Sequence, residues 1–304
     1  MKNASIKVEK SIKYIPLSCI CAIYINTTLD ELSLSIKSLL IQPNRPKEII
    51  IVIDGNIKIE VKKFLEFLDK KYKIFKFVKL NKNIGLGLAL REGLKYCKYN
   101  LIARFDSDDI NLKDRLKIQY EYISKNKAID ILGSYVKEYN YKNYYPNSKI
   151  KKVPRFDRDI KNLMNYRNPI NHPSILFKKE SILKAGSYES MLFFEDYYLW
   201  LKCKNKKYKF HNLGIPLLAM KRESNLLRRY GLRYAIFEIN FLYKSIKKNL
   251  LSIPSIFFFS TRLIIRILPR FILKFFYIYD YSRTKFKIDK DLANYINQLK
   301  KYNL

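Results

Sequence analysis

Three carboxylates follow an apolar run in the stretch NLIARFDSDDI, at Asp106, Asp108 and Asp109. Two acids at positions i and i+2, on a turn after a strand, can face one ligand. Hard divalent cations such as Mg²⁺ and Mn²⁺ prefer oxygen ligands, and Mg²⁺ usually takes one or two carboxylates together with substrate phosphates. The alternative is that Asp108 or Asp109 caps a helix that begins near Asn111. One cap needs one acid and explains only part of the cluster, so we expect a metal site that receives a phosphate.

Other residues that could do chemistry lie outside this acidic cluster, and each of them also has a purely structural interpretation. Glu195 and Asp196, in FEDYYLW, stand at a helix start, where acids complement the helix dipole. One of them could equally act as a general base, and their spacing does not decide between the two roles. His172, between two prolines in NPINHPS, and His211, in KYKFHNLG, are more typical of structural histidines.

Two further motifs lie nearer the N-terminus. Asp54-Gly55 follows an apolar run and could form a simple turn, or it could accept hydrogen bonds from a base or ribose. NIGLG, at residues 83–87, resembles a phosphate loop only loosely, because it lacks GxGxxG and the lysine-serine pair of a P-loop. A dinucleotide-binding fold and an NTPase are therefore disfavoured.

The elements that must position these groups alternate along residues 17–105. Buried strands are expected in LSCICAIYI, EIIIVIDG, IFKFVKL and LIARF, with helices between them. Thr28, three residues before Glu31, can form a capping box for the first helix. This alternation predicts an α/β fold with a mostly parallel sheet and helices on both faces. Ligands bind beyond the carboxyl ends of such strands, where Tyr24, Asp54-Gly55 and residues 106–109 stand.

The second half of the chain changes character beyond about Arg228, where long, basic and aromatic helices are expected. In LLSIPSIFFFSTRLIIRILPRFILKFFYIYD four basic residues recur every four positions, although charges interrupt the segment too often for a spanning helix. The segment could lie on anionic lipid as an interfacial helix, or it could pack on the catalytic domain, and the sequence leaves both open. The basic residues are Arg262, Arg266, Arg270 and Lys274.

The overall charge of +33, from 60 Lys+Arg against 27 Asp+Glu, implies attraction to something anionic. Nucleic acid, an acidic membrane or a phosphorylated substrate would fit, and so would a compositional bias from an AT-rich genome. The four cysteines form no CxxC pair, which disfavours zinc and disulfides and fits a reducing compartment. The N-terminus lacks the apolar core of a signal peptide, so we expect a cytoplasmic protein.

Six pieces of the chain, taken in order, resemble the family 2 glycosyltransferases, which have a GT-A fold. They are AIYIN, IIIVIDG, NKNIGLGLALREGLKYC, LIARFDSDD, RNPINHPSILFKKE and FFEDYYLWLK, and they run from about Leu17 to Arg222. The resemblance is greatest to amylovoran-type and other exopolysaccharide or lipopolysaccharide galactosyltransferases. It implies a catalytic domain over residues 1–235, followed by a basic helical extension over residues 236–304.

The resemblance implies inverting transfer of a hexose from a UDP-sugar to a glycan or lipid-linked glycan acceptor, in cell-surface polysaccharide synthesis. The hexose would be galactose, glucose or an N-acetylated hexosamine, and the cofactor Mn²⁺ or Mg²⁺. Contact with the inner face of an anionic membrane would suit such an acceptor, and no nucleic acid is expected. The family's motifs imply these roles: nucleotide-sugar binding by Ala22, Tyr24, Asp54, Asn83, Gly85, Asp106 and Asp108, metal binding by Asp108, and general-base catalysis by Asp196 with Glu195 as its neighbour. With Asp106 and Asp108 assigned in this way, Asp109 is left as the helix cap.

Some positions depart from the family pattern. Ile53-Asp54 offers one carboxylate where two are usual, Gly186-Ser187 replaces a glycine pair, and Arg222 is not followed by a histidine. Trp200, one turn beyond Asp196, could face the acceptor or only the core. Two other functions stay open from the residues alone: a nucleotidyltransferase of similar fold and a basic nucleic-acid-binding protein.

Overall fold

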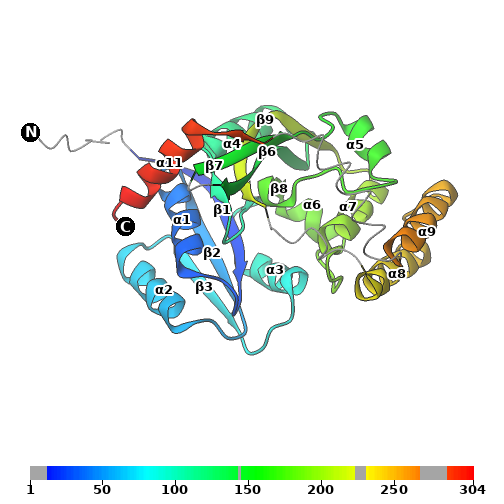
Figure 1. Cartoon of the computed structure of the whole chain (residues 1–304), viewed down its shortest axis with the longest axis horizontal. Helices are drawn as coiled ribbons and strands as arrows, with labels where there is room; N and C mark the ends of the chain where they lie inside the picture. The colour runs from blue at the N-terminus through cyan, green and yellow to red at the C-terminus, as the bar shows by residue number, and fades with distance from the viewer. Residues whose placement is uncertain (1–11, 143–144, 223–230, 268–285) are drawn as a thin grey trace, which may run out of the picture.

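The computed structural model describes residues 12–142, 145–222, 231–267 and 286–304, and its N-terminal half is a parallel sheet (Figure 1). Its strands are β1 (Lys13–Ile23), β2 (Asn44–Asp54), β3 (Phe75–Leu80) and β4 (Leu101–Arg104). β1 pairs in parallel with β2 and with β4, and β2 pairs in parallel with β3. This is the βαβ arrangement predicted from the alternating pattern.

The second half extends the same sheet with mixed pairing. The strand order is β10-β7-β6-β8-β4-β1-β2-β3, and β9 pairs in parallel with β6 and antiparallel with β5. The pairs β4–β8, β6–β8, β6–β7 and β10–β7 are also antiparallel, so the parallel prediction holds for the first half of the sheet. These strands are β5 (Ile110–Asn111), β6 (Ile131–Lys142), β7 (Tyr145–Lys151), β8 (Leu176–Lys178), β9 (Phe210–Lys221) and β10 (Lys287–Ile288).

Helices cover both faces of the sheet, as predicted. Successive side chains of β1 and β2 point to opposite faces, so each strand contributes apolar residues to the core on both sides. Ile20 and Val52 pack on one face beneath α3 (Leu86–Tyr96) and α7 (Glu195–Asn205). Cys19, Cys21 and Ile51 pack on the other face beneath α1 (Leu29–Leu40) and α2 (Ile59–Lys71). All four cysteines are buried and free.

The ends of two helices test the capping predictions. Thr28 and Glu31 form the predicted capping box, because the Glu31 backbone N–H donates to Thr28 Oγ1 (3.4 Å) and the Thr28 hydroxyl donates to Glu31 Oε2 (2.7 Å). The predicted helix from Asn111 is different. Residues 110–111 form β5, and α4 (Arg115–Lys125) begins only after Asp114, whose φ is 63°. The prediction that Asp109 caps this helix is therefore wrong.

The C-terminal segment contributes to two places. α8 (Leu232–Lys247) and α9 (Ile253–Ile267) form a hairpin that packs on α7 through Phe241 and Phe259. β10 and α11 (Lys290–Lys301) return to β7 and α1 at the other end of the molecule. The expected boundary at residue 236 thus falls inside α8, and residues beyond it also complete the sheet.

Among the described residues, the remaining helices are short: α5 (Asp157–Leu163), the 3₁₀ helix η1 (His172–Ser174) and α6 (Lys179–Lys184). Within the described ranges, no helix combines the length and the apolar character needed to cross a bilayer. Arg270 and Lys274 of the predicted basic stripe, and Pro269 between its halves, lie outside the described residues.

Candidate active site

A cleft of about 740 Å³ opens beyond the carboxyl end of β4 and is lined mainly by charged side chains. Its acidic residues come from the turn after β4, from β6 and from the start of α7. Its basic residues come from β4, β7, β9 and the residue after it, α9 and the loop after α5. The acidic members are Asp106, Asp108, Asp109, Glu138, Glu195 and Asp196, and the basic members are Arg104, Lys151, Arg167, Lys221, Arg222, Arg262 and Arg266.

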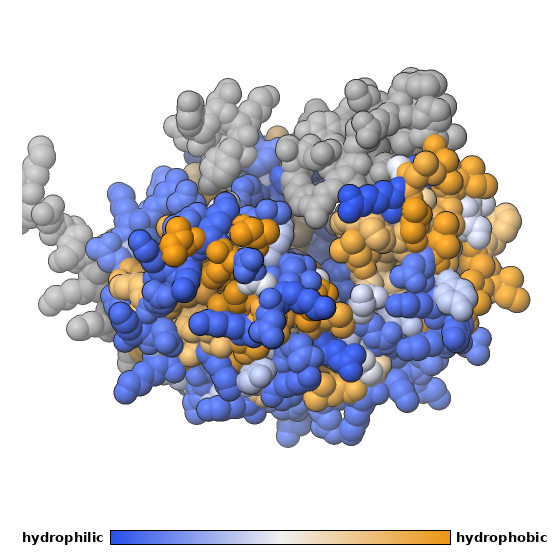
Figure 2. All heavy atoms as spheres, turned by 90° about the horizontal axis from the view of Figure 1, so that it is seen from below, coloured by the Kyte–Doolittle hydropathy of each residue, from blue (hydrophilic) through white to orange (hydrophobic). Residues whose placement is uncertain are grey.

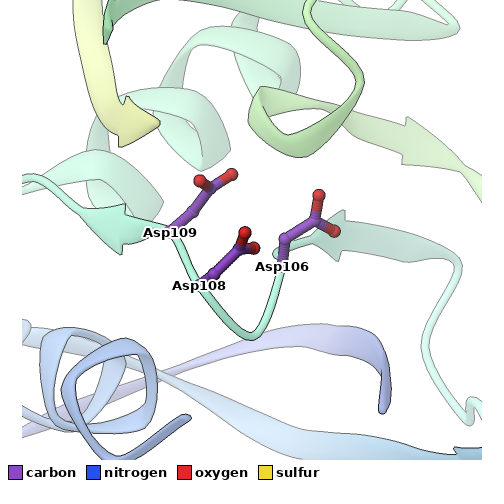
Figure 3. A group of neighbouring side chains, drawn as sticks. All are labelled: Asp106, Asp108 and Asp109. Carbon is purple, nitrogen blue, oxygen red and sulfur yellow. The ribbon is translucent and has the colours of Figure 1, made fainter. Parts of the chain in front are cut away.

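The three aspartates of DSDD lie together on one turn (Figure 3). One carboxylate oxygen of each lies within 4.8 Å of the others. The turn is fixed at its base, since the Ser35 hydroxyl donates to the backbone oxygen of Asp106 (2.7 Å) and Asp109 Oδ1 accepts the Lys221 backbone N–H (3.2 Å). Asp109 is buried, and its Oδ2 has no hydrogen-bond partner among the described residues. Such an oxygen is what a cation ligand would offer.

Crowding of negative charge changes the acidity of this cluster. Burial, followed by the nearby charge of Asp106, raises the pKa of Asp108 from 3.8 to about 6. Burial and the same neighbour raise the pKa of Asp109 well above its ordinary value. Ionisation of Asp108 and Asp109 is therefore unfavourable, and a bound cation would stabilise their ionised form. The donor set, three carboxylates and no sulfur or imidazole, fits Mg²⁺ or Mn²⁺.

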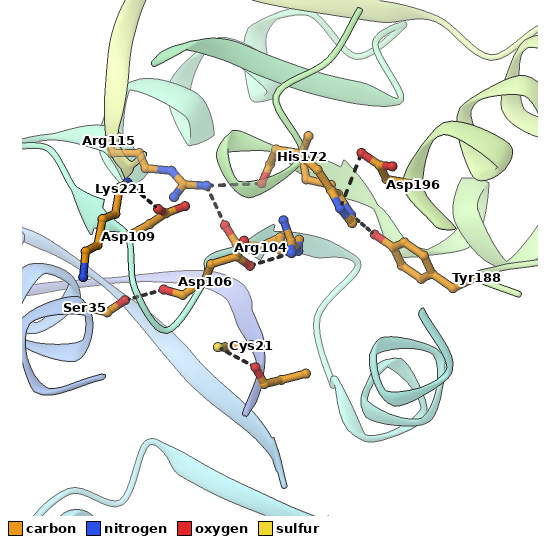
Figure 4. Close-up of polar contacts among 12 residues, drawn as sticks. Cys21, Ser35, Arg104, Asp106, Asp109, Arg115, His172, Tyr188, Asp196 and Lys221 are labelled. Atoms are coloured by element: carbon orange, nitrogen blue, oxygen red, sulfur yellow. Dashed lines mark hydrogen bonds and ion pairs between the residues drawn. The ribbon is translucent and has the colours of Figure 1, made fainter. Parts of the chain in front are cut away.

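Two buried arginines hold the cluster in place (Figure 4). Arg104, the last residue of β4, is ion-paired with Asp106 at 2.5 Å. Arg115 donates to the backbone oxygen of Arg104 (2.7 Å), to Asn111 Oδ1 (2.5 Å) and to Gln119 Oε1 (3.0 Å). Burial lowers the pKa of Arg115 to about 10, which still leaves it charged at neutral pH. Arg115 therefore ties the strand before the acidic turn to the helix after it.

The predicted nucleotide residues Asp54, Asn83 and Gly85 meet at the end of β2. The backbone N–H groups of Ile84 and Gly85 donate to Asp54 Oδ1 (2.8 Å) and Oδ2 (3.0 Å), and Asn83 Nδ2 donates to the Asp54 backbone oxygen (3.3 Å). Gly85 has φ +88°, a conformation that glycine adopts without strain. Asp54 thus anchors the loop that opens α3, and its contact with a base stays a prediction.

Ala22 lies near the carboxyl end of β1, which pairs with β2, and Tyr24 directly follows β1. Ala22 is in register with Val52 of β2, and Tyr24 is 42% exposed. None of these five predicted nucleotide residues lines the cleft itself, although Leu86, which follows Gly85, does. Asp106 and Asp108 do line it. The structure therefore places the predicted residues in two groups on the same edge of the sheet.

Asp196 lies in the first turn of α7 and is held from two sides. Asn168 Nδ2 donates to Asp196 Oδ2 (2.6 Å), and the Tyr197 backbone N–H donates to Asp196 Oδ1 (2.7 Å). Burial, followed by the charge of Asp196, raises the pKa of its neighbour Glu195 to about 7. Both acids face the cleft that also holds the DSDD turn. An acid on a helix start and an acidic turn are therefore combined in one site.

His172 belongs to this site, although its sequence context suggested a structural role. Its Nε2 is hydrogen-bonded to Tyr188 Oη (2.8 Å), and its Nδ1 lies 3.8 Å from Asp196 Oδ2. Burial, followed by the nearby Arg104, lowers its pKa well below the ordinary value, so the ring is neutral. Trp200 is fully buried with its ring 5.7 Å from that of His172, so it faces the core.

The other histidine is structural, as expected. His211 Nε2 is hydrogen-bonded to Tyr122 Oη (3.0 Å), and the two rings stack at 5.1 Å. Neither residue lines the cleft.

Sequence reasoning missed several side chains of the cleft. Arg104 ends an apolar strand pattern, which gives no sign of a site residue. Asn168 stands in the motif RNPINHPS, where His172 between two prolines is the more conspicuous residue. Arg262 and Arg266 belong to the basic stripe for which the sequence left lipid contact and packing on the catalytic domain open; both line the cleft and pair with Glu238 of α8. For these two arginines the structure favours the packing alternative, because the packing of α9 on α8 turns them inward.

A family profile decides what kind of protein this is. The profile described as "Glycosyl transferase family 2" matches residues 19–186, more than half of the chain. The chain belongs to glycosyltransferase family 2. The match covers the DSDD turn, the Asp54 loop and His172, and it ends before Asp196. Membership answers the choice between a glycosyltransferase and a nucleotidyltransferase that the residues alone left open.

Relatives of this glycosyltransferase extend the similarity beyond the profile. A "UDP-Gal:alpha-D-GlcNAc-diphosphoundecaprenol beta-1,3-galactosyltransferase" from Escherichia coli is 36% identical over 256 residues, covering 83% of this chain and 91% of that protein. The "Amylovoran biosynthesis glycosyltransferase AmsE" of Erwinia amylovora is 29% identical, covering 86% of this chain and 97% of that one. The expected resemblance to amylovoran-type enzymes is thereby confirmed.

Solved structures support the fold. The S. aureus TarS fragment 1-349 in complex with UDP-GlcNAc has a TM-score of 0.56 at 16% identity, over 75% of this chain and 66% of that one. The same fragment in complex with UDP gives a TM-score of 0.53 at 17% identity. The GT-A fold predicted for this glycosyltransferase is confirmed.

Proposed function

We propose that this glycosyltransferase moves a hexose from a UDP-sugar to a lipid-linked glycan acceptor with inversion at the anomeric carbon, in the synthesis of a cell-surface polysaccharide. Galactose is the first candidate among galactose, glucose and N-acetylated hexosamines, because the Escherichia coli relative is named for UDP-Gal. The name of that relative also gives a sugar on diphosphoundecaprenol as its acceptor. The observation that carries the proposal is that Asp196 and the DSDD turn line one cleft.

Asp196 would act as the general base. In an inverting transfer the acceptor hydroxyl attacks the anomeric carbon on the face opposite the departing nucleoside diphosphate, and its proton must go to a base. Asp196 Oδ1 and Oδ2 are oriented by the Tyr197 backbone N–H and by Asn168, so the carboxylate is held in one position. General-base help of this kind contributes typically 10²–10⁴-fold. No covalent intermediate is needed.

A divalent cation, Mn²⁺ or Mg²⁺, would be held by Asp108, with Asp109 as a further candidate ligand because its buried Oδ2 lacks a partner among the described residues. When bound there, the cation would stabilise negative charge on the diphosphate. Arg104 would keep Asp106 in position at the same turn. The protein's own part is to hold three carboxylates within 4.8 Å of one another.

The nucleotide would bind along the edge formed by β1 and β2. In this proposal Asp54 contacts the base, Ala22 and Tyr24 cradle the nucleotide, Asn83 and Gly85 border it, and Asp106 contacts the ribose. The fixed loop at residues 83–85 supports this, because it presents a backbone already ordered by Asp54.

We also propose that the protein acts at the inner surface of a membrane, without binding nucleic acid. Apolar side chains gather at the end of the molecule formed by α8 and α9 (Figure 2). An apolar helical surface in a strongly basic chain suits peripheral contact with anionic lipid. The exposed apolar residues include Leu232 (67%), Ile236 (63%), Tyr243 (63%), Ile253 (83%), Phe257 (73%) and Ile264 (66%).

The test is a transfer assay with UDP-Gal, UDP-Glc and UDP-GlcNAc, lipid-linked N-acetylglucosamine as acceptor, and Mn²⁺ or Mg²⁺. We expect UDP release with at least one donor, a product of inverted configuration by NMR, and loss of activity in EDTA. Asp196→Asn should lower kcat about 10²–10⁴-fold, whereas Asp159→Asn, at an exposed position on α5, should not. Near-normal turnover of Asp196→Asn, or a product of retained configuration, would contradict the mechanism.

A further inference from the structure

Two arginines of α9 line the cleft and share one buried carboxylate. Arg262 donates through Nε (2.6 Å) and Nη2 to Glu238 Oε1, and Arg266 donates through Nε to Glu238 Oε2. The Glu238 side chain is fully buried, while those of Arg262 and Arg266 are 23% and 12% exposed. Glu238 thus orients two guanidinium groups on one wall of the cleft.

Aromatic rings hold both guanidinium groups in fixed positions. The Arg262 guanidinium lies 4.5 Å from the centre of the Phe259 ring, and the Arg266 guanidinium lies 4.4 Å from the centre of the Tyr234 ring. A planar guanidinium held in this way matches the oxygens of a phosphate group, and it loses little conformational entropy on binding. This wall is therefore suited to an anion with phosphate geometry.

The two arginines line the same cleft as the DSDD turn, and aromatic contacts link them to the proposed base. Tyr197, next to Asp196, stacks on Phe241 of α8 at 5.1 Å and lies 6.1 Å from the Phe259 ring that carries Arg262. The donor diphosphate already has a proposed partner, the cation at the DSDD turn. An anion at α9 would instead belong to the substrate that approaches the base.

The same hairpin presents its apolar residues to the outside. Ile253, Phe257 and Ile264 of α9 are 83%, 73% and 66% exposed. The order of groups is thus a base, then two arginines, then an apolar surface. A sugar joined through a diphosphate to a lipid carries its groups in the same order: an attacking hydroxyl, two phosphates and a hydrocarbon chain.

We infer that Arg262 and Arg266, oriented by Glu238, form the subsite for the diphosphate of the acceptor. This inference rests on the proposed function, and it assigns the part of the site that would select acceptors carried on a diphosphate. Free pyrophosphate and anionic lipid headgroups share this chemistry, so the test must separate them from the acceptor.

The test compares two acceptors that differ only in the diphosphate: N-acetylglucosaminyl diphosphodecane and decyl N-acetylglucosaminide. The principal variant is Glu238→Gln with Arg262→Gln and Arg266→Gln, because removing the arginines alone would leave a buried charge unpaired. Arg262→Lys with Arg266→Lys is a second variant that keeps the charge but loses the planar fork. Arg158→Gln, at an exposed position on α5, is the control.

We expect the triple variant to lower the ratio of kcat/KM for the diphosphate acceptor to that for the neutral acceptor by roughly 10- to 100-fold, through KM, because contacts to two charged donors are lost. The lysine variant should lose less, and the control nothing. An unchanged ratio would overturn the inference. A rise in KM for the UDP-sugar instead would assign the arginines to the donor.

Binding measurements keep this test independent of turnover. Calorimetry with N-acetylglucosaminyl diphosphodecane, inorganic pyrophosphate and phosphatidylglycerol vesicles should show a loss of affinity in the variants that is largest for the sugar diphosphate. Equal loss for all three probes, or loss for vesicles alone, would contradict an acceptor subsite. If the wild-type protein binds the sugar diphosphate through these arginines but transfers no hexose, the proposed function fails and the subsite stands.

Discussion

Replacing Asp108 by asparagine should make the metal-free protein more stable while it abolishes transfer. Asp108 carries its charge in a partly buried turn beside Asp106, which raises its pKa from 3.8 to about 6. The folded state therefore binds a proton over a pH range in which the unfolded chain has lost it. The free energy of unfolding therefore falls as the pH rises from 3.8 to about 6, and the destabilisation by Asp108 is complete above about pH 6.

The size of the effect follows from the shift. A displacement of about two pKa units corresponds to an upper limit of about 3 kcal/mol in the free energy of unfolding at pH 8. Asp108 is only partly shielded from solvent, so screening reduces this to about 1–2 kcal/mol. In a chain of this size that is a rise in Tm of roughly 2–4 °C. Asparagine has a similar shape and carries no charge, so it removes the cost without leaving a void.

The assay is thermal unfolding in EDTA at pH 8 and pH 5, followed by the same measurement with added Mn²⁺. Asp108→Asn should melt above the wild type at pH 8, by an amount that shrinks at pH 5, where the wild-type carboxyl is largely protonated. Mn²⁺ should raise the Tm of the wild type by mass action and leave the variant nearly unchanged. Asp108→Asn should therefore have the higher Tm in EDTA at pH 8, and the wild type should have the higher Tm with Mn²⁺.

Asp69→Asn, at an exposed position on α2, is the matched control and should shift the free energy of unfolding by no more than about 0.5 kcal/mol. The reasoning would be refuted if Asp108→Asn were no more stable than the wild type at pH 8 in EDTA. A gain of equal size at pH 5 would also count against it, because the cost would then not arise from ionisation.

Three further predictions concern the surroundings of the site. Asn168→Ala should lower kcat about 10-fold or more, with KM for the UDP-sugar little changed, because Asp196 loses the donor that orients it, and steady-state kinetics will check this. Gly87→Ala should cost about 1–3 kcal/mol in chemical denaturation and reduce kcat, because the added Cβ would lie 2.9 Å from Glu195 Cβ. The four cysteines should react with thiol reagents only on unfolding, even at pH 9, because they are buried and burial raises the pKa of Cys19 to about 12; rapid labelling of the native protein would contradict this.

Local patterns were enough to predict the first half of the fold. Strand and helix signals over residues 17–105 depend on neighbours in sequence, as in the capping box of Thr28 and Glu31. The two residues of β5 could not be found this way, because Ile110 and Asn111 pair with β9, which is about a hundred residues further along the chain. Asp109 was misassigned as a helix cap for the same reason.

The charged residues of the candidate site were harder to predict from the sequence than the elements of the fold. Arg115 looks like any surface arginine of an amphipathic helix, yet it is fully buried, because Asn111, Gln119 and the backbone of Arg104 supply its acceptors. The spacing of Arg262 and Arg266 correctly puts them on one face of a helix. Spacing alone does not say what that face meets, and the inward orientation depends on α8.

The return of α11 to the first helix has a consequence for how the protein is made. Leu292, Ile296 and Leu299 pack in a cluster with Ile110 of β5, and the Tyr295 hydroxyl donates to the backbone oxygen of Asn111 (3.0 Å). A ribosome produces α11 long after β5, the strand that this helix supports. The parallel core can assemble early in translation, but β5, which directly follows the acidic turn, would gain its last support only when α11 has emerged. Nascent chains that stop before α11 would then be folded in their core and still lack a finished active site.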